Sequence, residues 1–154
     1  MLLDVDHFKK VNDTHGHPMG DEVLRRLATV LKQVVPRSTD LSARYGGEEF
    51  VVILSGTEER GARQVAERIR GAIALETFGG DLDEGFKVTV SAGIASFPGN
   101  ARTKHDLIEK ADRALYASKQ SGRNRVTTWT ALQEPTAPEI PRTPDLGESN
   151  RVMP

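Results

Sequence analysis

The sequence contains no cysteine, which excludes disulfide bonds and thiolate chemistry. It has no apolar run near the roughly 20 residues of a membrane span, and its start lacks the basic and apolar regions of a signal peptide. We therefore expect a cytoplasmic location and no membrane contact by this segment. Neither charge sign dominates, and the net charge of -1 gives no reason to expect a nucleic-acid partner.

Several common catalytic and phosphate-binding motifs are also missing. There is no Gly-x-x-x-x-Gly-Lys-Ser/Thr run, no Gly-x-Gly-x-x-Gly after a strand and no Gly-x-Ser-x-Gly elbow. The 154 residues suffice for one globular domain with a single core. Any chemistry must therefore come from another arrangement of side chains on that domain.

The hydrophobic pattern predicts short strands that alternate with amphipathic helices. We expect strands at 2–5, 87–96 and 124–129, a β-hairpin over 41–54, and helices at 20–35, 58–75 and 104–120. The hairpin argues against a doubly wound parallel sheet. The order favours an α/β fold of the α+β type, with a mixed, mostly antiparallel sheet flanked by helices.

The end of the chain differs in composition from the rest. Five of the eight prolines lie within residues 135–154, where little could pack against a core. Such a segment buries too little apolar surface to offset the entropy lost on ordering. We predict one domain over residues 1–129 and a Pro-rich disordered tail over residues 130–154.

Two adjacent acids, Glu48 and Glu49, lie at the predicted turn of the hairpin, within Arg44-Tyr45-Gly46-Gly47-Glu48-Glu49-Phe50. We expect Gly46 and Gly47 to supply the positive φ angles of a short primed turn. A turn does not need two acids that repel each other. The segment is either an ordinary solvated turn or a tip that presents carboxylates to a ligand.

A second acidic group, Asp4 and Asp6, ends the first predicted strand. Mg²⁺ usually takes one or two protein carboxylates together with phosphate oxygens and water. Asp4 and Glu48 could therefore hold such a cation, and a pair of metal ions is what nucleotidyl transfer uses. The alternative is that Asp4 caps the strand end.

Asn12 and Asp21 carry the groups needed to recognise guanine, since an amide both donates and accepts and a carboxylate accepts. The alternative is a turn followed by a helix N-cap at Asp21. His15 and His17 lie nearby, but two histidines without a third ligand are more typical of surface or turn residues than of a metal site.

Two basic groups also have two interpretations each. Lys119 and Arg123, near a helix C-terminus, could interact with the helix dipole or bind the β- and γ-phosphates of a triphosphate. Arg37 and Asp40 could form a local ion pair or read a guanine base. The acidic loop at residues 81–83 lacks the ligands of a Ca²⁺ loop, so we interpret it as solvated.

Together these residues resemble the GGDEF domain of diguanylate cyclases, in its GGEEF variant, in order and spacing from Leu2 to about Val126. The resemblance rests on five motifs, at residues 4–13, 16–21, 44–50, 88–95 and 111–125. It implies a ferredoxin-like palm of the nucleotide-cyclase type. It also implies the condensation of two GTP molecules into the second messenger cyclic di-GMP, with release of two pyrophosphates.

The resemblance implies a role for each matched residue. The metal ligands, for Mg²⁺ or Mn²⁺, would be Asp4, Glu48 and the backbone carbonyl of Val5. The catalytic residues would be Asp4, Glu48, Glu49, Lys119 and Arg123, with Glu49 supporting metal binding or activation of the 3′-hydroxyl. The substrate-binding residues would be Asn12 and Asp21 for guanine, Lys119, Arg123 and the amides around His7, Phe8 and Lys9 for phosphates, and Gly46 and Gly47 at the turn.

The family pattern also implies partners and regulation. Each domain would bind one GTP, so the active species would be a homodimer. Arg37 and Asp40 match the product-inhibition site of the family and Arg68 a secondary contact, so cyclic di-GMP would be both product and inhibitor. A sensor that binds GTP or cyclic di-GMP without turnover is the alternative. Family members normally have a further helix before the first strand, so we expect an N-terminally truncated domain.

Overall fold

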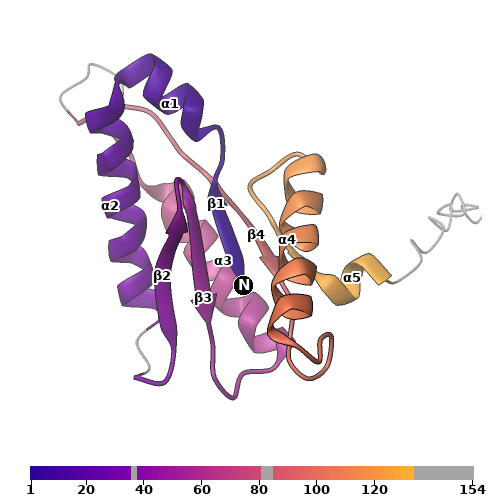
Figure 1. Ribbon diagram of the computed structural model, residues 1–154. Coiled ribbons are helices and arrows are strands. Elements are labelled where there is room, and N and C mark those ends of the chain that lie inside the picture. Colours follow the sequence, from indigo (N-terminus) through magenta and orange to yellow (C-terminus); the bar gives the residue numbers. More distant parts are fainter. Residues whose placement is uncertain (36–37, 81–84, 134–154) are drawn as a thin grey trace, which may run out of the picture.

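A computed structural model describes residues 1–35, 38–80 and 85–133. In these ranges a five-stranded sheet is flanked by helices (Figure 1). The elements in chain order are β1 (Leu2–Val5), α1 (Phe8–His15), α2 (His17–Val34), β2 (Leu41–Gly46), β3 (Glu49–Ile53), α3 (Glu59–Leu75), β4 (Val90–Ile94), α4 (Lys104–Gln120), β5 (Val126–Thr128) and α5 (Trp129–Gln133).

The strands are ordered β2-β3-β1-β4-β5, and every neighbouring pair is antiparallel except β4 and β5, which are parallel. The predicted mixed, mostly antiparallel sheet is thus confirmed. All four residues of β1 are buried, because this strand lies at the centre of the sheet. Its last residues are therefore enclosed by the neighbouring strands β3 and β4.

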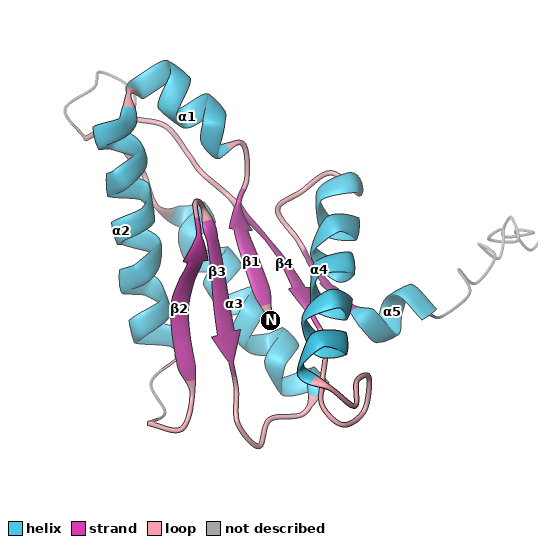
Figure 2. Cartoon of the chain, in the orientation of Figure 1, coloured by secondary structure: helices cyan, strands magenta, loops and turns pink. Residues whose placement is uncertain are grey.

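The two faces of the sheet are covered by different helices (Figure 2). Leu3 and Val5 of β1 belong to the main core, which they share with α2 and α3, whereas Leu2 packs with Ala111 and Leu115 of α4. Successive residues of a strand point to opposite faces. Asp4 therefore lies on the face that α4 covers.

Helix α4 approaches β4 closely at Gly93. A Cβ atom on Gly93 would lie 2.1 Å from both the carbonyl oxygen of Ala111 and the backbone nitrogen of Leu115. Near the end of the helix, the Ser118 hydroxyl donates to the carbonyl oxygen of Ala92 at 2.8 Å. These contacts fix the last turn of α4, which carries Lys119, over the centre of the sheet.

Helix α2 begins at His17, three residues before the predicted start at Gly20. Pro18 lies in its first turn, where the N–H of any residue would lack an intrahelical acceptor, so no helical hydrogen bond is lost at proline. Asp21 therefore lies beyond the first turn, and its interpretation as an N-cap was wrong. Pro36, the expected end of this helix, lies outside the described residues.

The hydrophobic pattern missed α1 and α5, the two shortest of the described helices, and overestimated the lengths of two strands. In α1 only Val11 is buried, too little to form an apolar stripe. β4 covers Val90–Ile94 of the predicted 87–96, and β5 covers Val126–Thr128 of the predicted 124–129. Over these outer residues the chain continues as loop or, at Trp129, enters α5.

Helix α5 corrects the predicted boundary of the tail. Residues 130–133 were expected to be disordered, but they belong to this helix. The helix contacts the domain, since the Lys110 ammonium lies 5.7 Å from the centre of the Trp129 ring. The rest of the predicted tail and the acidic loop at 81–83 lie outside the described residues. In the ranges that are described, no helix is both long and apolar enough to cross a membrane.

Candidate functional site

Three chain segments end at the same edge of the fold: β1, the tip of the β2–β3 hairpin and α4 (Figure 1). The antiparallel pairing of β1 with β3 places Asp4 opposite Glu49. The backbone N–H of Val5 points to the carbonyl oxygen of Glu48 at 3.4 Å. The acidic residues predicted from separate motifs are therefore brought together.

The tip of the hairpin differs in one respect from the prediction. Gly47 has a positive φ of 50°, but Gly46 does not and is the last residue of β2, so the expectation of a positive φ at Gly46 was wrong. A shift in register between Arg44 and Gly46 supplies the remaining bend. The Arg44 Nε–H donates to the carbonyl oxygen of Gly47 at 2.7 Å, which holds the turn in place.

Asp4 is a buried carboxylate with one basic partner. Its side chain is 10% exposed, and Lys119 Nζ lies 2.8 Å from its Oδ2 atom. Burial raises the pKa of Asp4, the hydrogen bond and charge of Lys119 lower it, and the charges of Glu48 and Glu49 raise it further. The net result is that the pKa of Asp4 is raised. Lys119 therefore does not fully compensate the negative charge of the ionised carboxylates, and a divalent cation could do so.

Asp6 lies two residues further on and has different surroundings. Its Oδ1 atom accepts from the Ser91 hydroxyl at 2.7 Å, and its Oδ2 atom accepts from the Thr89 hydroxyl at 2.7 Å and the Asn124 N–H at 3.0 Å. Protein donors thus satisfy both oxygens of this buried carboxylate. Asp6 connects β1, β4 and the loop after α4.

That loop has an uncommon backbone. Gly122, Arg123 and Asn124 have consecutive positive φ angles of 105°, 61° and 46°. A non-glycine residue in the left-handed region costs on the order of 1–2 kcal/mol and persists where its surroundings impose it. The one other non-glycine residue with a positive φ in the described ranges is His7. All three such residues flank the acidic site.

His7 precedes the first turn of α1. Within the part of the chain that is described, no side chain caps this helix N-terminus. The first amides of a helix, here including those of Phe8 and Lys9, have no intrahelical acceptor, and such an end favours anions. Lys119 and Arg123 lie on the opposite side of β1, in and after α4. This edge of the fold therefore combines acidic residues with groups suited to phosphate.

Asn12 of α1 lies against α2 at Gly20. A Cβ atom on Gly20 would lie 2.0 Å from Asn12 Oδ1. This oxygen is buried and has no hydrogen-bond partner among the described residues. A buried acceptor without a donor is rare in folded proteins and indicates a place where a ligand could donate.

Asp21, one residue after Gly20, is exposed and lines a cavity of about 340 Å³ between α2 and β2. The cavity is also lined by Leu24, Arg25, Arg44 and Phe50, but Asn12 is not part of the lining. The two predicted guanine-binding residues are therefore brought near each other, since Asn12 contacts Gly20, the residue before Asp21.

Of the residues predicted for product inhibition, Asp40 lies away from this edge. Asp40 precedes β2, at the other end of the hairpin, and its Oδ1 atom accepts from the Ser55 N–H at 2.9 Å. Arg68 is exposed on α3. Arg37 lies outside the described residues. The acidic tip and Asp40 are therefore separated by the length of the hairpin.

His15 makes an aromatic contact in the described part of the chain. The ring of His15 stacks on Phe86, with centroids 4.1 Å apart and planes 6° from parallel. The described ranges hold no cluster of three or more His, Cys, Asp or Glu that could bind a metal ion. A cation at Asp4 and Glu48 would need further oxygens, which phosphate and water supply for Mg²⁺.

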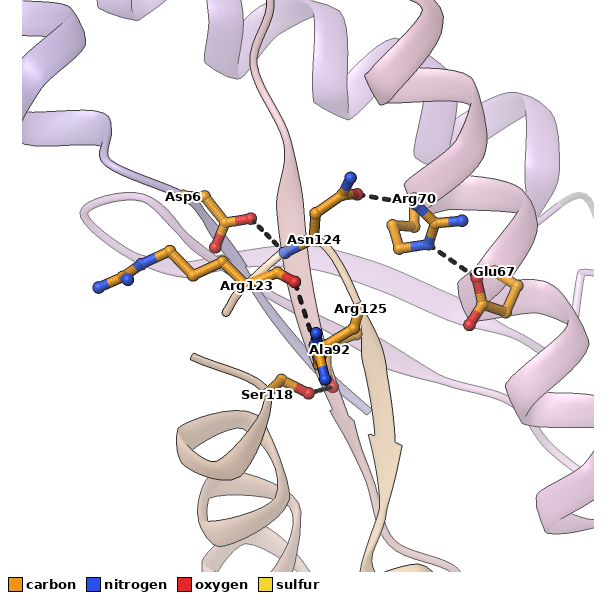
Figure 3. Close-up of polar contacts among 8 residues, drawn as sticks. All are labelled: Asp6, Glu67, Arg70, Ala92, Ser118, Arg123, Asn124 and Arg125. Carbon is orange, nitrogen blue, oxygen red and sulfur yellow. Dashed lines mark hydrogen bonds and ion pairs between the residues drawn. The ribbon is translucent and has the colours of Figure 1, made fainter. Parts of the chain in front are cut away.

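One polar network was missed from the sequence. The Arg70 Nη1–H donates to Asn124 Oδ1 at 2.7 Å, and its Nε–H donates to Glu67 Oε2 at 2.7 Å (Figure 3). The chain did offer a signal. Asn124 follows the Gly-Arg pair after α4, and asparagine tolerates left-handed backbone better than most residues.

Comparisons with known proteins agree with this geometry. The sequence profile of the family described as "Diguanylate cyclase, GGDEF domain" matches residues 1–125. Diguanylate cyclase A of Treponema denticola is 44% identical over 127 residues, which are 82% of this chain and 34% of that protein. The chain thus spans about a third of this relative.

Two solved structures have the same fold. The GGDEF domain of DgcB from Caulobacter crescentus, in complex with c-di-GMP, is 40% identical, with a TM-score of 0.77 over 84% of this chain and 75% of that one. The active GGEEF domain of a diguanylate cyclase from Vibrio cholerae is 34% identical, with a TM-score of 0.77 over 83% and 80%. The sequence, the fold and the site together show that this chain belongs to the GGDEF domain family.

Proposed function

We propose that this chain is a diguanylate cyclase domain, which condenses two GTP molecules into cyclic di-GMP and releases two pyrophosphates. The observation that carries the proposal is the convergence on buried Asp4 of the hairpin acids and of Lys119, 2.8 Å away. Nucleotidyl transfer needs both kinds of group, acids for metal ions and bases for phosphates. The names of the similar proteins agree with this activity.

The acidic residues fit a divalent metal ion. Asp4 and Glu48, together with the carbonyl oxygen of Val5, would hold Mg²⁺ or Mn²⁺ through the hard oxygen ligands that these ions prefer. The ion pair with Lys119 places a cationic group at the carboxylate of Asp4. When bound, the metal would favour ionisation of a 3′-hydroxyl and stabilise negative charge on the reacting phosphate.

The protein groups around the acids would position the substrate. Lys119 and Arg123 would bind the β- and γ-phosphates, with help from the backbone amides around His7, Phe8 and Lys9. The buried Oδ1 of Asn12 would accept a hydrogen bond from guanine, and Asp21 would accept a second. A Cβ atom on Gly46 or Gly47 would meet nothing within 4 Å, which leaves the turn open to a nucleotide. Glu49 would support metal binding or activate the 3′-hydroxyl.

The proposed reaction calls for a homodimer. In cyclic di-GMP each nucleotide supplies a 3′-hydroxyl that attacks the α-phosphate of the other. One domain has one such acidic site in its described part, so two domains would face each other with one GTP in each. Holding both reactants in this orientation would make the attack effectively intramolecular.

The activity is tested by incubating the chain with GTP and Mg²⁺ while pyrophosphate and cyclic di-GMP are measured. Glu48→Gln keeps the size of the side chain but removes its charge. We expect it to lower turnover by at least about 10²–10³-fold, as loss of a transition-state-stabilising group does. Glu22→Gln, at an exposed position on α2, should leave turnover unchanged. Binding of GTP without product, even at high protein concentration, would instead favour the sensor.

We also propose that cyclic di-GMP inhibits the enzyme through Arg37, Asp40 and Arg68. Support comes from the match to the family pattern and from the position of Asp40 at the far end of the hairpin from Glu48. Arg37→Ala should abolish tight binding of cyclic di-GMP, measured by calorimetry, and leave uninhibited turnover intact. Unchanged binding of cyclic di-GMP by this variant would disprove the regulatory site.

A further inference from the structure

Both peptide groups that flank Arg123 are held by hydrogen bonds. On one side, the Arg123 N–H donates to the carbonyl oxygen of Ser118 at 3.0 Å. On the other side, the N–H of Asn124 donates to Asp6 Oδ2 at 3.0 Å. These two peptide groups set the φ and ψ angles of Arg123. Asp6 is therefore one of two acceptors that keep this residue in its left-handed conformation.

The carboxylate of Asp6 is itself rigidly held. It is buried, and the hydroxyl groups of Ser91 in β4 and of Thr89, just before this strand, donate to it at 2.7 Å each. The carboxylate of this residue, which follows directly after β1, is therefore held against β4. Through it, the backbone of a surface loop is tied to the same strand that carries the proposed metal ligand.

The side chains of Asn124 and Arg123 point in opposite directions, and that of Asn124 is held by a hydrogen bond. Figure 3 shows Asn124 pointing to Arg70 on α3, whereas Arg123 extends past Asp6 and away from α3. The Arg70–Asn124 hydrogen bond is 2.7 Å long, and Glu67 holds Arg70 in turn. An Arg side chain is flexible, so its starting direction depends on how firmly its backbone is held.

We propose that Asp6 is a positioning residue that acts through Arg123. Asn124, which is hydrogen-bonded to both Asp6 and Arg70, connects the same loop to α3. This inference rests on the proposed function, in which Arg123 binds the terminal phosphates of GTP. Asp6 fixes the loop before the nucleotide arrives, so that less conformational freedom is lost when Arg123 engages the phosphates. It does not touch the substrate.

The test is a double-mutant cycle on nucleotide affinity. The ligands are 3′-deoxy-GTP, which lacks the attacking hydroxyl, and GMP, which lacks the β- and γ-phosphates. Asp6→Ala should weaken binding of 3′-deoxy-GTP about tenfold, the range of a hydrogen bond to a charged group, and leave GMP unaffected. In an Arg123→Ala background, Asp6→Ala should cause no further loss.

Three further variants serve as controls. Asp6→Asn keeps an oxygen for the Asn124 N–H and should restore most of the affinity. Arg70→Ala removes the hydrogen bonds to Asn124 and to Glu67 but leaves the buried carboxylate of Asp6 in place, so this variant should fold even if Asp6→Ala does not. It should show a smaller loss of affinity for 3′-deoxy-GTP, with the same dependence on Arg123. Thr128→Ala removes a different buried hydroxyl, in β5, whose partner is the N–H of Ala131, and should lower stability without changing either affinity.

Two results would overturn the inference. One is that Asp6→Ala or Arg70→Ala weakens binding of 3′-deoxy-GTP as much in the Arg123→Ala background as in the wild-type background. The other is equal weakening of both nucleotides. In either case wild-type binding of 3′-deoxy-GTP would leave the proposed function standing. A wild-type chain that binds neither nucleotide would overturn the proposed function and this inference together.

Discussion

Asp4 and Asp6 lie two residues apart at the end of β1, yet the fold gives their carboxylates different surroundings. Asp6 accepts three hydrogen bonds from protein donors, whereas Asp4 has one basic partner and two acidic neighbours. A buried carboxylate without enough donors is costly to the fold. At the residue scale, this cost marks Asp4 as the carboxylate available to a ligand.

Asp4 should therefore reduce stability at neutral pH. Its pKa is raised above the ordinary value of 3.8, first of all by burial, so the folded chain binds a proton there more tightly than the unfolded chain. The resulting stabilisation is fully present below pH 3.8 and is lost as the pH rises through the raised pKa. We expect Asp4→Asn to increase the free energy of unfolding at pH 7, measured by urea denaturation, while abolishing turnover.

The pH dependence separates this effect from a general change in stability. The difference between Asp4→Asn and wild type should shrink towards zero below pH 3.8, where Asp4 is neutral in both folded and unfolded chains. Asp112→Asn, at an exposed position on α4, should give no comparable gain. A less stable Asp4→Asn variant at pH 7 would show that the ion pair with Lys119 outweighs burial.

At the scale of elements, the position of α4 decides where Lys119 and Arg123 lie. The helix reaches β4 only because Gly93 has no side chain, as a Cβ atom there would lie 2.1 Å from backbone atoms of α4. Backbone atoms cannot rotate away as a flexible side chain can. The packing of this single glycine therefore positions the basic end of the helix over the acidic end of β1.

We expect Gly93→Ala to destabilise the domain by about 3 kcal/mol or more, the upper part of the range for overpacking a core. It should also weaken GTP binding, because α4 must move away from β1. Gly71→Ala is the matched control: it lies inside α3, where a Cβ atom meets nothing within 4 Å. This control should stabilise by up to about 1 kcal/mol through helix propensity. Equal stability of the two variants in urea would contradict the packing argument.

At the scale of the whole molecule, the site lies at one end of the central strand β1, where the tip of the hairpin and the C-terminal end of α4 also lie. A reaction between two GTP molecules held by two such domains requires that the domains meet. Specific activity should therefore rise with protein concentration until the dimer is saturated, measured as initial rates across a dilution series. Fusion to a dimeric coiled coil should raise the activity at low concentration.

This prediction has a direct physical check. Sedimentation velocity on the same dilution series reports the oligomeric state, and the rise in specific activity should follow the population of dimer. Constant specific activity in a range where the chain is monomeric would show that one domain suffices, contrary to the proposed arrangement. A dimer without activity would leave the sensor as the better interpretation.

The sequence by itself determined those features that depend on local periodicity and on motif spacing. The apolar stripe of α4 predicted Lys104–Gln120 as observed, and the matched motifs identified the family before any contact was known. Short elements were less predictable. α1 buries a single residue, and the hairpin bends through a shift in register and one left-handed glycine instead of the expected two.

Only the tertiary structure decided the surroundings of each acidic and basic residue, and these surroundings separate residues of the same charge from one another. Nothing in the spacing of Asp4 and Asp6 separates their roles, because the donors that satisfy Asp6 come from β4, from the residue before it and from the loop after α4, far along the chain. The same holds for Arg123, whose backbone is held by a residue near the other end of the domain. Burial and hydrogen-bond satisfaction are properties of the packed chain, so they appear only once the sheet is assembled.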